Sequence, residues 1–431
     1  MSFPVLARVP AASPSNPPER TRYAQKAEAR DDGPTGPVTS ISPYGEIAET
    51  VRSAPGREST DGALYKDFGR NGKGKDRINV PGWRIGGQRL DISRPHGVFR
   101  PNFRHFRRFG AQMTAAFTFP GQGSQAVGMG RALAEGFPAA RAVFDEVDAA
   151  LGEKLTSVIW EGSAETLQLT ENAQPALMAV SLATLRVLEA EAGFSVARDA
   201  AFVAGHSLGE YSALAAAGSL SISDTARLLR TRGLAMQKAV PVGVGAMAAL
   251  LGLDYEAAMA VANEAAQGQV CQAANDNGGG QVVVSGDKAA VERALEIAKT
   301  RGAKRAMLLP VSAPFHCRLM LPAAEVMAKA LSEVVIRPPA SPLVSNVLAA
   351  PITDPDEIRR RLIEQVTGTV RWRESVAFMA SHGVTRFFEI GAGKVLSGLV
   401  KRIADGAIGI SVGGPNDLAA AKDALAAVAT A

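Results

Sequence analysis

The pentapeptide Gly-His-Ser-Leu-Gly at 205–209 constrains the fold of this chain more than any other feature. It follows a short apolar run, residues 200–204, and opens the alanine-rich stretch 210–217. An apolar run, a serine between glycines and a helix-forming stretch make up a nucleophile elbow, a sharp strand-to-helix turn that exposes the serine hydroxyl. The helix that follows offers backbone N–H groups and a positive dipole end to an oxyanion. The motif predicts that Ser207 is catalytic, although the same pattern also occurs in purely structural turns.

The chain has 431 residues, which is enough for two to three domains. Hydrophobic residues make up 46% of it and charged residues 21%, so a large core is available. The net charge of +5 is unevenly distributed, because residues 1–112 carry 19 Lys and Arg against 11 Asp and Glu, a net charge of +8. The remaining residues carry 28 against 31. The basic character therefore belongs to the N-terminal segment, and we expect no nucleic-acid partner for the folded part.

Residues 1–112 are rich in Pro, Gly, Ser and Arg and show no sustained periodicity. Such a composition buries too little apolar surface to offset chain entropy, so we predict a low-order (disordered) basic extension. Its arginine-rich end, residues 104–108, is compatible with an acidic surface but fits a solvated tail better. Met113 precedes the first predicted strand, so translation starting there is one interpretation. A transit peptide is another, which the acidic residues oppose.

Targeting and redox signals are sparse. No apolar run approaches the roughly 18–20 residues of a membrane-spanning helix, and the N-terminus lacks the apolar core of a signal peptide. Cys271 and Cys317 have no C-x-x-C spacing, which favours free thiols and gives no metal site. We therefore expect a cytoplasmic protein with no membrane association.

Beyond Ala115, short apolar runs alternate with helical patterns, which is typical of an α/β fold. We predict a large α/β-hydrolase-like domain with a mostly parallel sheet, formed by 113–240 and 310–431. Its predicted strands are 115–119, 200–204, 343–347 and 386–390, and its predicted helices are 141–151, 175–192, 210–217, 222–238, 323–334, 356–367 and 373–382.

The stretch 241–309 has a different order of predicted elements from the rest of the chain. Strand, helix, strand, strand, helix and strand are predicted at 246–253, 255–266, 270–274, 281–285, 288–301 and 305–311. This βαββαβ order is that of a ferredoxin-like unit. We predict a small ferredoxin-like domain inserted into the large one.

A serine nucleophile needs a base, because its hydroxyl is protonated at neutral pH. Three histidines follow the extension. His206 lies inside the elbow, where adjacent side chains diverge, and His382 lies at a helix end, where a histidine commonly serves the helix dipole. His316 lies in a loop directly after the last strand of the small domain, where catalytic groups are common. We favour His316 as the base over a purely structural histidine.

Two further segments carry polar groups of interest. The glycine-rich turn 119–125 follows the first strand without the spacing of a dinucleotide-binding loop or the Lys of a P-loop. It is either a second oxyanion donor or a tight structural turn. Arg232 lies in the largely apolar stretch 228–236 and must find an anion. A substrate carboxylate and an internal Asp or Glu fit equally well at this point.

Six segments together resemble the malonyl-CoA:acyl-carrier-protein transacylases of type II fatty acid synthesis. They are Phe119 to Gln125, Gly205 to Tyr211, the Arg232 segment, Ser312 to Cys317, Gln365 with Val370-Arg371-Trp372, and Glu389 to Leu396. The resemblance runs from about Thr114 to Ile410 and omits only the N-terminal extension and the last residues.

The resemblance implies a Ser-His dyad that transfers an acyl group by a ping-pong mechanism. Ser207 would be the nucleophile and His316 the general base, oriented by the main-chain carbonyl of Gln365. The backbone N–H groups of Gln122 and Leu208 would form the oxyanion hole.

The resemblance also implies a substrate site. Arg232 would bind the free carboxylate of the malonyl group. Gln174 and Asn277 lie in segments near the cleft, and Phe315 would narrow the pocket. Malonyl-CoA would be the substrate, acyl carrier protein the acceptor, and no bound cofactor or metal is expected in what we expect to be a monomer. The acceptor pathway, fatty acid or polyketide, stays open.

Two other functions compete with this interpretation. A serine hydrolase such as a thioesterase uses the same elbow but delivers water, and acidic residues between Ser207 and His316 permit its Ser-Asp-His chain order. A carrier-protein-binding module with a decayed site is the second alternative. The predicted inserted unit and Arg232 favour the transferase.

Overall fold

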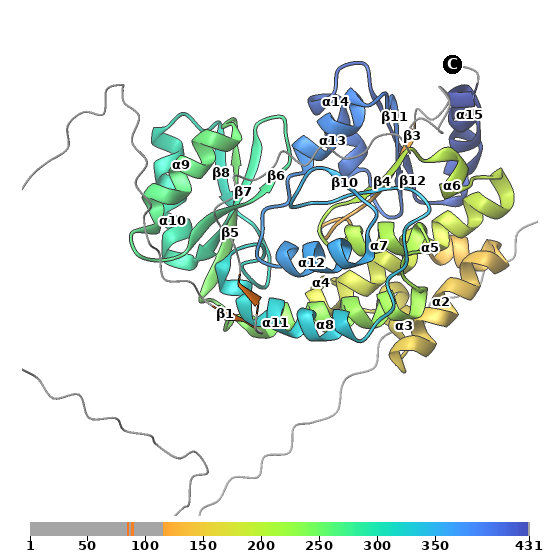
Figure 1. Cartoon of the computed structure of the whole chain (residues 1–431), viewed down its shortest axis with the longest axis horizontal. Coiled ribbons are helices and arrows are strands. Elements are labelled where there is room, and N and C mark those ends of the chain that lie inside the picture. Colours follow the sequence, from red (N-terminus) through yellow and green to blue (C-terminus); the bar gives the residue numbers. More distant parts are fainter. Residues whose placement is uncertain (1–83, 86–87, 90–114, 430–431) are drawn as a thin grey trace, which may run out of the picture. The chain divides into compact units, whose positions relative to one another are not determined.

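The structure, a computed structural model, describes residues 84–85, 88–89 and 115–429 (Figure 1). The chain divides into two compact units, 1–95 and 96–431. In the first unit the described residues form a short antiparallel pair, β1 (Arg84–Ile85) with β2 (Gln88–Arg89). The rest of the predicted extension 1–112, including its arginine-rich end, lies outside the described residues.

A six-stranded sheet forms the centre of the second unit, in the order β10-β9-β4-β3-β11-β12. All neighbouring strands are parallel except the antiparallel edge pair β10 and β9. The mixed α/β fold with a mostly parallel sheet is therefore confirmed. The strand bounds are β3 (Ala115–Phe119), β4 (Phe202–Gly205), β9 (Leu343–Val344), β10 (Pro351–Ile352), β11 (Arg386–Ile390) and β12 (Ile408–Val412).

The central strands are buried on both faces, which explains their continuous apolar character. Because side chains alternate along a strand, Phe117 and Phe119 of β3 face one hydrophobic core while Ala116 faces another. The same alternation places Val203 of β4 in the first core and Phe202 in the second. The sheet thus separates two layers of helices.

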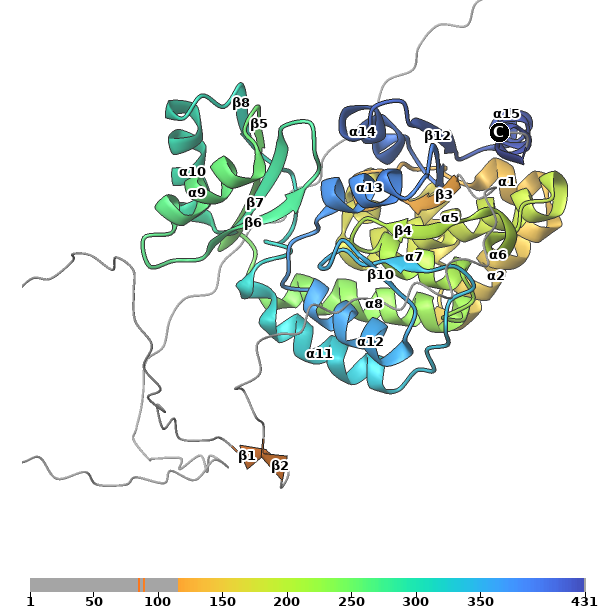
Figure 2. The same ribbon diagram turned by 45° about the horizontal axis from the view of Figure 1, so that its top comes forward.

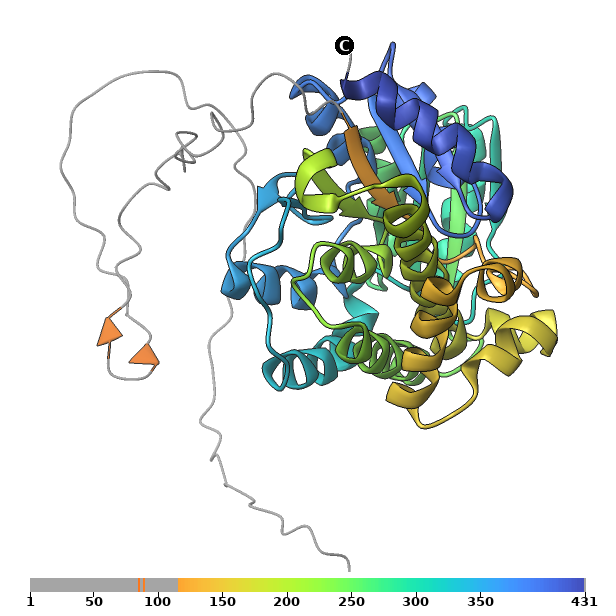
Figure 3. The same ribbon diagram turned by 90° about the vertical axis from the view of Figure 1, so that its right-hand side faces the viewer.

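The first and larger core is covered by long helices that Figure 3 shows grouped together, from gold α2 to green α8. The helices on this side are α1 (Arg131–Gly136), α2 (Pro138–Leu151), α3 (Leu155–Glu161), α4 (Ala164–Gln168), α5 (Thr170–Ala192), α6 (Val196–Asp199), α7 (Gly209–Ala216), α8 (Ile222–Ala239), α11 (Leu321–Ser332), α12 (Pro355–Gln365) and α15 (Leu418–Ala429). The second core is covered by α13 (Trp372–Ser381) and α14 (Val395–Ile403), and two short 3-10 turns lie at Arg318–Met320 and Pro415–Asp417.

A second sheet has its own core and lies apart from the first in Figures 1 and 2. Its order is β6-β7-β5-β8, with every pair antiparallel. The strands are β5 (Gly245–Leu251), β6 (Cys271–Asp276), β7 (Gln281–Asp287) and β8 (Arg305–Leu308), and the helices are α9 (Tyr255–Ala266) and α10 (Lys288–Thr300). The predicted strand 305–311 ends early, because Pro310 has no N–H with which to continue the pairing.

The largest error in the predicted helices is the start of α5, which begins at Thr170 and not at Pro175. A proline inside a helix normally leaves the carbonyl four residues earlier without a partner. Here that carbonyl belongs to Glu171, and Arg230 Nη1 donates to it at 2.7 Å. The helix therefore continues through the proline. The helices α1, α3, α4, α6, α14 and α15 and the strands β10 and β12 were absent from the sequence prediction.

No helix within the described ranges is both long and apolar enough to span a bilayer. Both cysteines are buried free thiols.

The turn that holds the elbow requires glycine. A Cβ at residue 205 would lie 1.9 Å from the carbonyl oxygen of Gly209, which is backbone and cannot move aside. We predict that Gly205→Ala destabilises the protein at or above the upper end of the about 1–3 kcal/mol typical of overpacking, measured by urea unfolding. Gly136→Ala is the control, because a Cβ there meets nothing within 4 Å. Equal stability of the two variants would contradict this account of the turn.

Candidate active site

The elbow holds Ser207 in a strained conformation at the carboxyl end of the central sheet. β4 ends at Gly205, α7 begins at Gly209, and Ser207 between them has a φ of 54°, in the left-handed region. A Cβ on Gly209 would lie 2.3 Å from the carbonyl oxygen of Phe119, so α7 packs against the end of β3 through this glycine. Strain of this kind persists where the surrounding structure compels it, and it is common at active sites.

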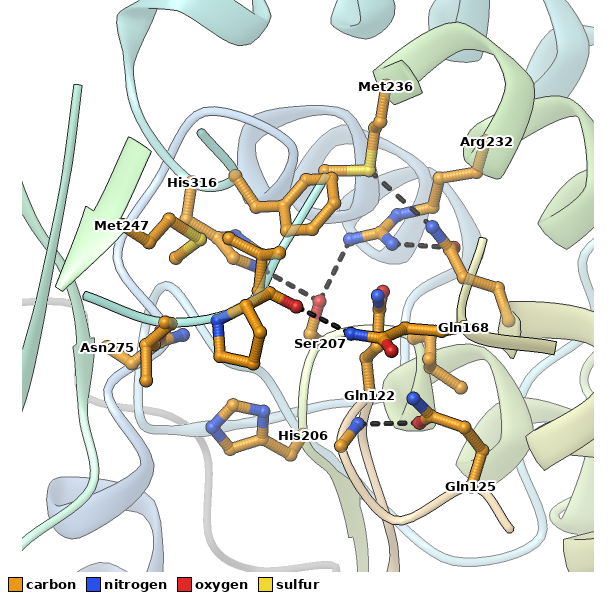
Figure 4. Close-up of a pocket in the computed structure, with 17 residues that line it drawn as sticks. Gln122, Gln125, Gln168, His206, Ser207, Arg232, Met236, Met247, Asn275 and His316 are labelled. Carbon is orange, nitrogen blue, oxygen red and sulfur yellow. Dashed lines mark hydrogen bonds between the residues drawn. The ribbon is translucent and has the colours of Figure 1, made fainter. Parts of the chain in front are cut away.

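Ser207 and His316 form a hydrogen-bonded pair, although 109 positions separate them. Ser207 Oγ lies 2.7 Å from His316 Nε2 (Figure 4). On the other side of the ring, Nδ1 lies 2.9 Å from the carbonyl oxygen of Gln365 and 3.2 Å from that of Gly368. Carbonyl oxygens only accept hydrogen bonds, so Nδ1 carries the proton and Nε2 is left to accept the serine proton. The imidazole is oriented by main-chain carbonyls, and no carboxylate among residues 115–429 bonds to it.

Burial keeps this imidazole neutral. His316 is 4% exposed, and desolvation followed by the nearby Arg232 charge lowers its pKa to about 3. The imidazole is therefore unprotonated at neutral pH, which leaves Nε2 free to accept a hydrogen bond from the Ser207 hydroxyl.

Arg232 approaches the same hydroxyl from α8. Its Nη2 donates to Ser207 Oγ at 3.1 Å and to Gln365 Oε1 at 2.8 Å, and its Nη1 donates to Gln174 Oε1 at 2.7 Å. The residue is 1% exposed, and its Nε has no hydrogen-bond partner in the described part of the chain. Burial lowers its pKa. The sequence left open whether Arg232 pairs with an internal acid. In the described part of the structure its three hydrogen-bond acceptors are two side-chain amides and a hydroxyl, all of them uncharged.

These groups open into a cavity of about 400 Å³. Its polar wall carries Ser207, His316 and Arg232, and its apolar wall includes Phe315 and Met236 (Figure 4). A cavity with a few convergent polar groups on an apolar lining is the usual form of a small-molecule site. It has the volume to take a short acyl group together with part of its carrier.

Two backbone N–H groups are available beside the serine. Gln122 follows β3 and Leu208 precedes α7, and both residues line the cavity. Within residues 115–429 neither backbone N–H has a hydrogen-bond acceptor. The side chain of Gln122 is held by Thr170, whose Oγ1 donates to Gln122 Oε1 at 2.9 Å.

One of the predicted substrate-site residues, Asn277, lies outside the lining of the cavity. Its Oδ1 lies 2.9 Å from His206 Nε2, behind the wall, and Asn275 lines the cavity instead. His206 does line it, and burial lowers its pKa. His382 lies at the end of α13, with Nδ1 2.7 Å from the carbonyl oxygen of Phe378, far from this network.

Sequence reasoning missed two buried residues that hold the elbow. Asn346 Oδ1 accepts from the Ser207 N–H at 2.8 Å, and Asn346 Nδ2 donates to the Gly205 carbonyl at 2.7 Å. Glu210 accepts from Gln365 Nε2 at 2.7 Å. Glu210 could have been found, since it is a charge in an otherwise apolar stretch; Asn346 carries no such signal.

No cluster of three or more His, Cys, Asp or Glu side chains suited to a metal ion occurs among the residues that the structure covers. The chemistry available at this site is that of a serine, an imidazole and a guanidinium.

The lowered pKa of His316 predicts a distinct NMR titration. We expect its ¹⁵N imidazole signals to stay those of the neutral ring from pH 8 down to 5, whereas an exposed histidine titrates near 6.5. Arg232→Gln removes a positive charge that disfavours the imidazolium, so it should raise the pKa of His316. Arg131, which is half-exposed and pairs with Glu161, supplies the control, Arg131→Gln, which should leave the His316 titration unchanged. A His316 midpoint near 6.5 in the unaltered protein would refute the burial argument.

The comparisons with known proteins agree with this geometry. The acyl transferase domain family matches residues 116–410. The malonyl CoA-acyl carrier protein transacylase of Bacillus subtilis strain 168 is 51% identical over 289 residues, covering 67% of this chain and 90% of the relative.

Solved structures are equally similar. The acyl-carrier-protein S-malonyltransferase of Bartonella henselae has 56% identity and a TM-score of 0.71, covering 73% of this chain and 100% of its own. A malonyl-transacylase solved in complex with a type II polyketide acyl-carrier protein has 42% identity and a TM-score of 0.69, covering 72% of this chain and 99% of its own. The resemblance drawn from the six sequence segments is confirmed, and the chain belongs to the malonyl-CoA:acyl-carrier-protein transacylase family of acyltransferases.

Proposed function

We propose that the protein transfers the malonyl group of malonyl-CoA to the phosphopantetheine thiol of acyl carrier protein through a malonyl-Ser207 ester. The observation that carries the proposal is that Ser207 Oγ is hydrogen-bonded to a neutral imidazole and to a buried guanidinium at once. The first contact activates the hydroxyl, and the second selects an acyl group that bears a carboxylate.

In the first half-reaction Ser207 Oγ attacks the thioester carbonyl as His316 Nε2 takes the hydroxyl proton. The carbonyl oxygen becomes an oxyanion that the N–H groups of Gln122 and Leu208 stabilise, each contributing about 3 kcal/mol in comparable sites. The C–S bond then breaks, and the thiolate of coenzyme A leaves with the proton from the imidazolium. Gln365 holds the ring in place through its main-chain carbonyl.

In the second half-reaction the phosphopantetheine thiol takes the place of coenzyme A. His316 Nε2 accepts the thiol proton, the sulfur attacks the ester carbonyl, and the proton returns to Ser207 Oγ as the C–O bond breaks. The two half-reactions share one site, which gives ping-pong kinetics.

Arg232 supplies the specificity for malonyl. Pairing with the substrate carboxylate orients the ester and gives the buried cation the anion that its present neutral partners do not provide. An acetyl group would leave the cation unpaired, which is costly in a buried site. Gln174 holds Nη1 of the guanidinium, Phe315 narrows the apolar side of the pocket, and Asn277 acts only through His206.

The proposal extends to organisation and setting. The strand order of β5 to β8 and the separate core support a ferredoxin-like small domain, 241–309, inserted in a discontinuous α/β-hydrolase-like large domain, 113–240 and 310–431. We further propose a cytoplasmic monomer that needs no bound cofactor and supplies malonyl groups to fatty acid synthesis. Its relatives are named for malonyl CoA-acyl carrier protein transacylase activity.

The nucleophile is tested by covalent labelling. Incubation with malonyl-CoA should add one malonyl group to the intact protein by mass spectrometry, and Ser207→Ala should abolish the addition because no other hydroxyl among residues 115–429 is hydrogen-bonded to His316. Ser212→Ala on the same helix is the control and should retain the label. Label that persists in Ser207→Ala would contradict the assignment, as would predominant release of free malonate, which is the result a hydrolase would give.

The selectivity is tested at Arg232. Truncating one partner of a buried charge pair costs about 2–5 kcal/mol, so Arg232→Ala should slow acylation by malonyl-CoA by roughly 30-fold or more. Acylation by acetyl-CoA should not slow. Stopped-flow or quenched-flow measurement of both rates checks this, and an equal loss for both donors would show that Arg232 does not recognise the carboxylate.

A further inference from the structure

Arg232 is a buried cation whose hydrogen-bond acceptors in the described part of the chain are all uncharged. Its guanidinium is 1% exposed, and no carboxylate oxygen within residues 115–429 lies within 4.0 Å of its nitrogens. Its hydrogen-bond acceptors are two side-chain amides and one hydroxyl. A buried cation without a counter-charge is strongly destabilising.

A buried carboxylate lies one amide away. Glu210, the second residue of α7, is 0% exposed and accepts from Gln365 Nε2 at 2.7 Å. The other end of the same amide, Gln365 Oε1, accepts from Arg232 Nη2 at 2.8 Å. The amide of Gln365 thus stands between the anion and the cation, with its donor toward Glu210 and its acceptor toward Arg232.

The polarity of this amide is set by its surroundings. Gln365 Nε2 also donates to the carbonyl oxygen of Ser207 at 2.8 Å, and Glu210 Oε1 accepts from the Asn346 N–H at 3.2 Å. Glu210 therefore accepts a hydrogen bond at each of its two oxygens. A carboxylate can do this, whereas an amide in its place would have only one acceptor oxygen. Reversing the Gln365 amide would face its NH₂ toward the guanidinium, where only donors would meet.

We propose that Glu210 is the resident counter-charge of Arg232, and that it acts through the oriented amide of Gln365 as a positioning residue for malonyl recognition. This inference rests on the proposed function. A direct ion pair would satisfy the guanidinium before substrate arrives and would compete with the substrate carboxylate. Holding the anion one amide away stabilises the buried cation while leaving it able to pair with the incoming acid.

The charges of the two groups are coupled, as this arrangement requires. Burial raises the pKa of Glu210 to about 7, while its hydrogen bonds, first of all that from Gln365, and lastly the charge of Arg232 lower it. Burial lowers the pKa of Arg232, and Tyr211 followed by Glu210 raises it. Glu210 does not line the cavity, so it has no contact with the acyl group.

Glu210→Gln tests the proposal by donor selectivity. The variant keeps the shape but removes the charge and one acceptor, so acylation by malonyl-CoA should slow about tenfold or more, the effect expected when a buried donor is left unsatisfied. Acylation by acetyl-CoA needs no carboxylate contact and should change by less than about threefold by the same reasoning. The malonyl-to-acetyl ratio therefore falls, a result that a purely structural role would not produce.

The matched control is Ser212→Ala, two positions further along α7. Its hydroxyl is also buried and has no hydrogen-bond partner in the described part of the chain. The control should keep the wild-type ratio. The conservative variant Glu210→Asp retains the charge and should keep more of the malonyl preference than Glu210→Gln. An unchanged ratio in Glu210→Gln, or equal slowing with both donors, would overturn the proposal.

A second measurement leaves Glu210 in place, which keeps the proposal falsifiable if Glu210→Gln does not fold. Removing the cation by Arg232→Gln should raise the pKa of Glu210, so at pH 8 a protonated-carboxyl infrared band should appear that the wild type lacks. Arg227→Gln on the same helix is the control, because Arg227 is half-exposed and pairs with Asp224. The absence of a new band in Arg232→Gln would overturn the coupling. Failure of wild-type protein to take up malonyl label would instead refute the proposed function itself.

Discussion

The burial of an arginine beside a serine is the constraint on which the rest of this site depends. Arg232 cannot give up its charge in the way a buried lysine or histidine can. Every group around it must therefore tolerate a cation. Gln174 and Gln365 present amide oxygens to it, and the base His316 stays neutral partly because of it. The charge of Arg232 thus acts together with burial to keep His316 neutral, and it meets the oxygen end of both neighbouring amides.

The fold brings the residues of this site together from distant parts of the chain. The serine comes from the turn after β4, the arginine from α8, the base from the loop after β8, and Gln365 from the end of α12. Gln365 links them all: its side chain contacts Arg232 and Glu210, and its main-chain carbonyl holds His316. Gln365 is completely buried, so these contacts with Arg232, Glu210 and His316 are shielded from water.

The sequence predicted the parts of this site whose signal is local. Ser207 was predicted as the nucleophile because glycines on both sides and an apolar run before it are features of adjacent residues. His316 was predicted as the base by elimination among three histidines and by its position after a strand, and the structure brings the two side chains within hydrogen-bonding distance. Asn346 could not be found, because its role depends on β9 lying beside β4, which brings a residue 139 positions away onto the Ser207 N–H. Asn277 was predicted to lie near the cleft, and the turn after β6 places its Oδ1 2.9 Å from Nε2 of His206, which lines the cavity.

The amino-acid sequence by itself determined the α/β class, the elbow, the order of elements in the stretch 241–309 and the family, because these follow from short-range periodicity, from glycine positions and from motifs in register. Only the tertiary structure decided which partners the buried charges have. The sequence could not distinguish a substrate carboxylate from an internal acid as the anion for Arg232, since a separation of a few ångströms between residues far apart in the chain is set by packing. The folded chain holds Glu210 one amide away from the guanidinium. This separation depends on how α7, α8 and α12 pack together, so no single segment of the sequence could predict it.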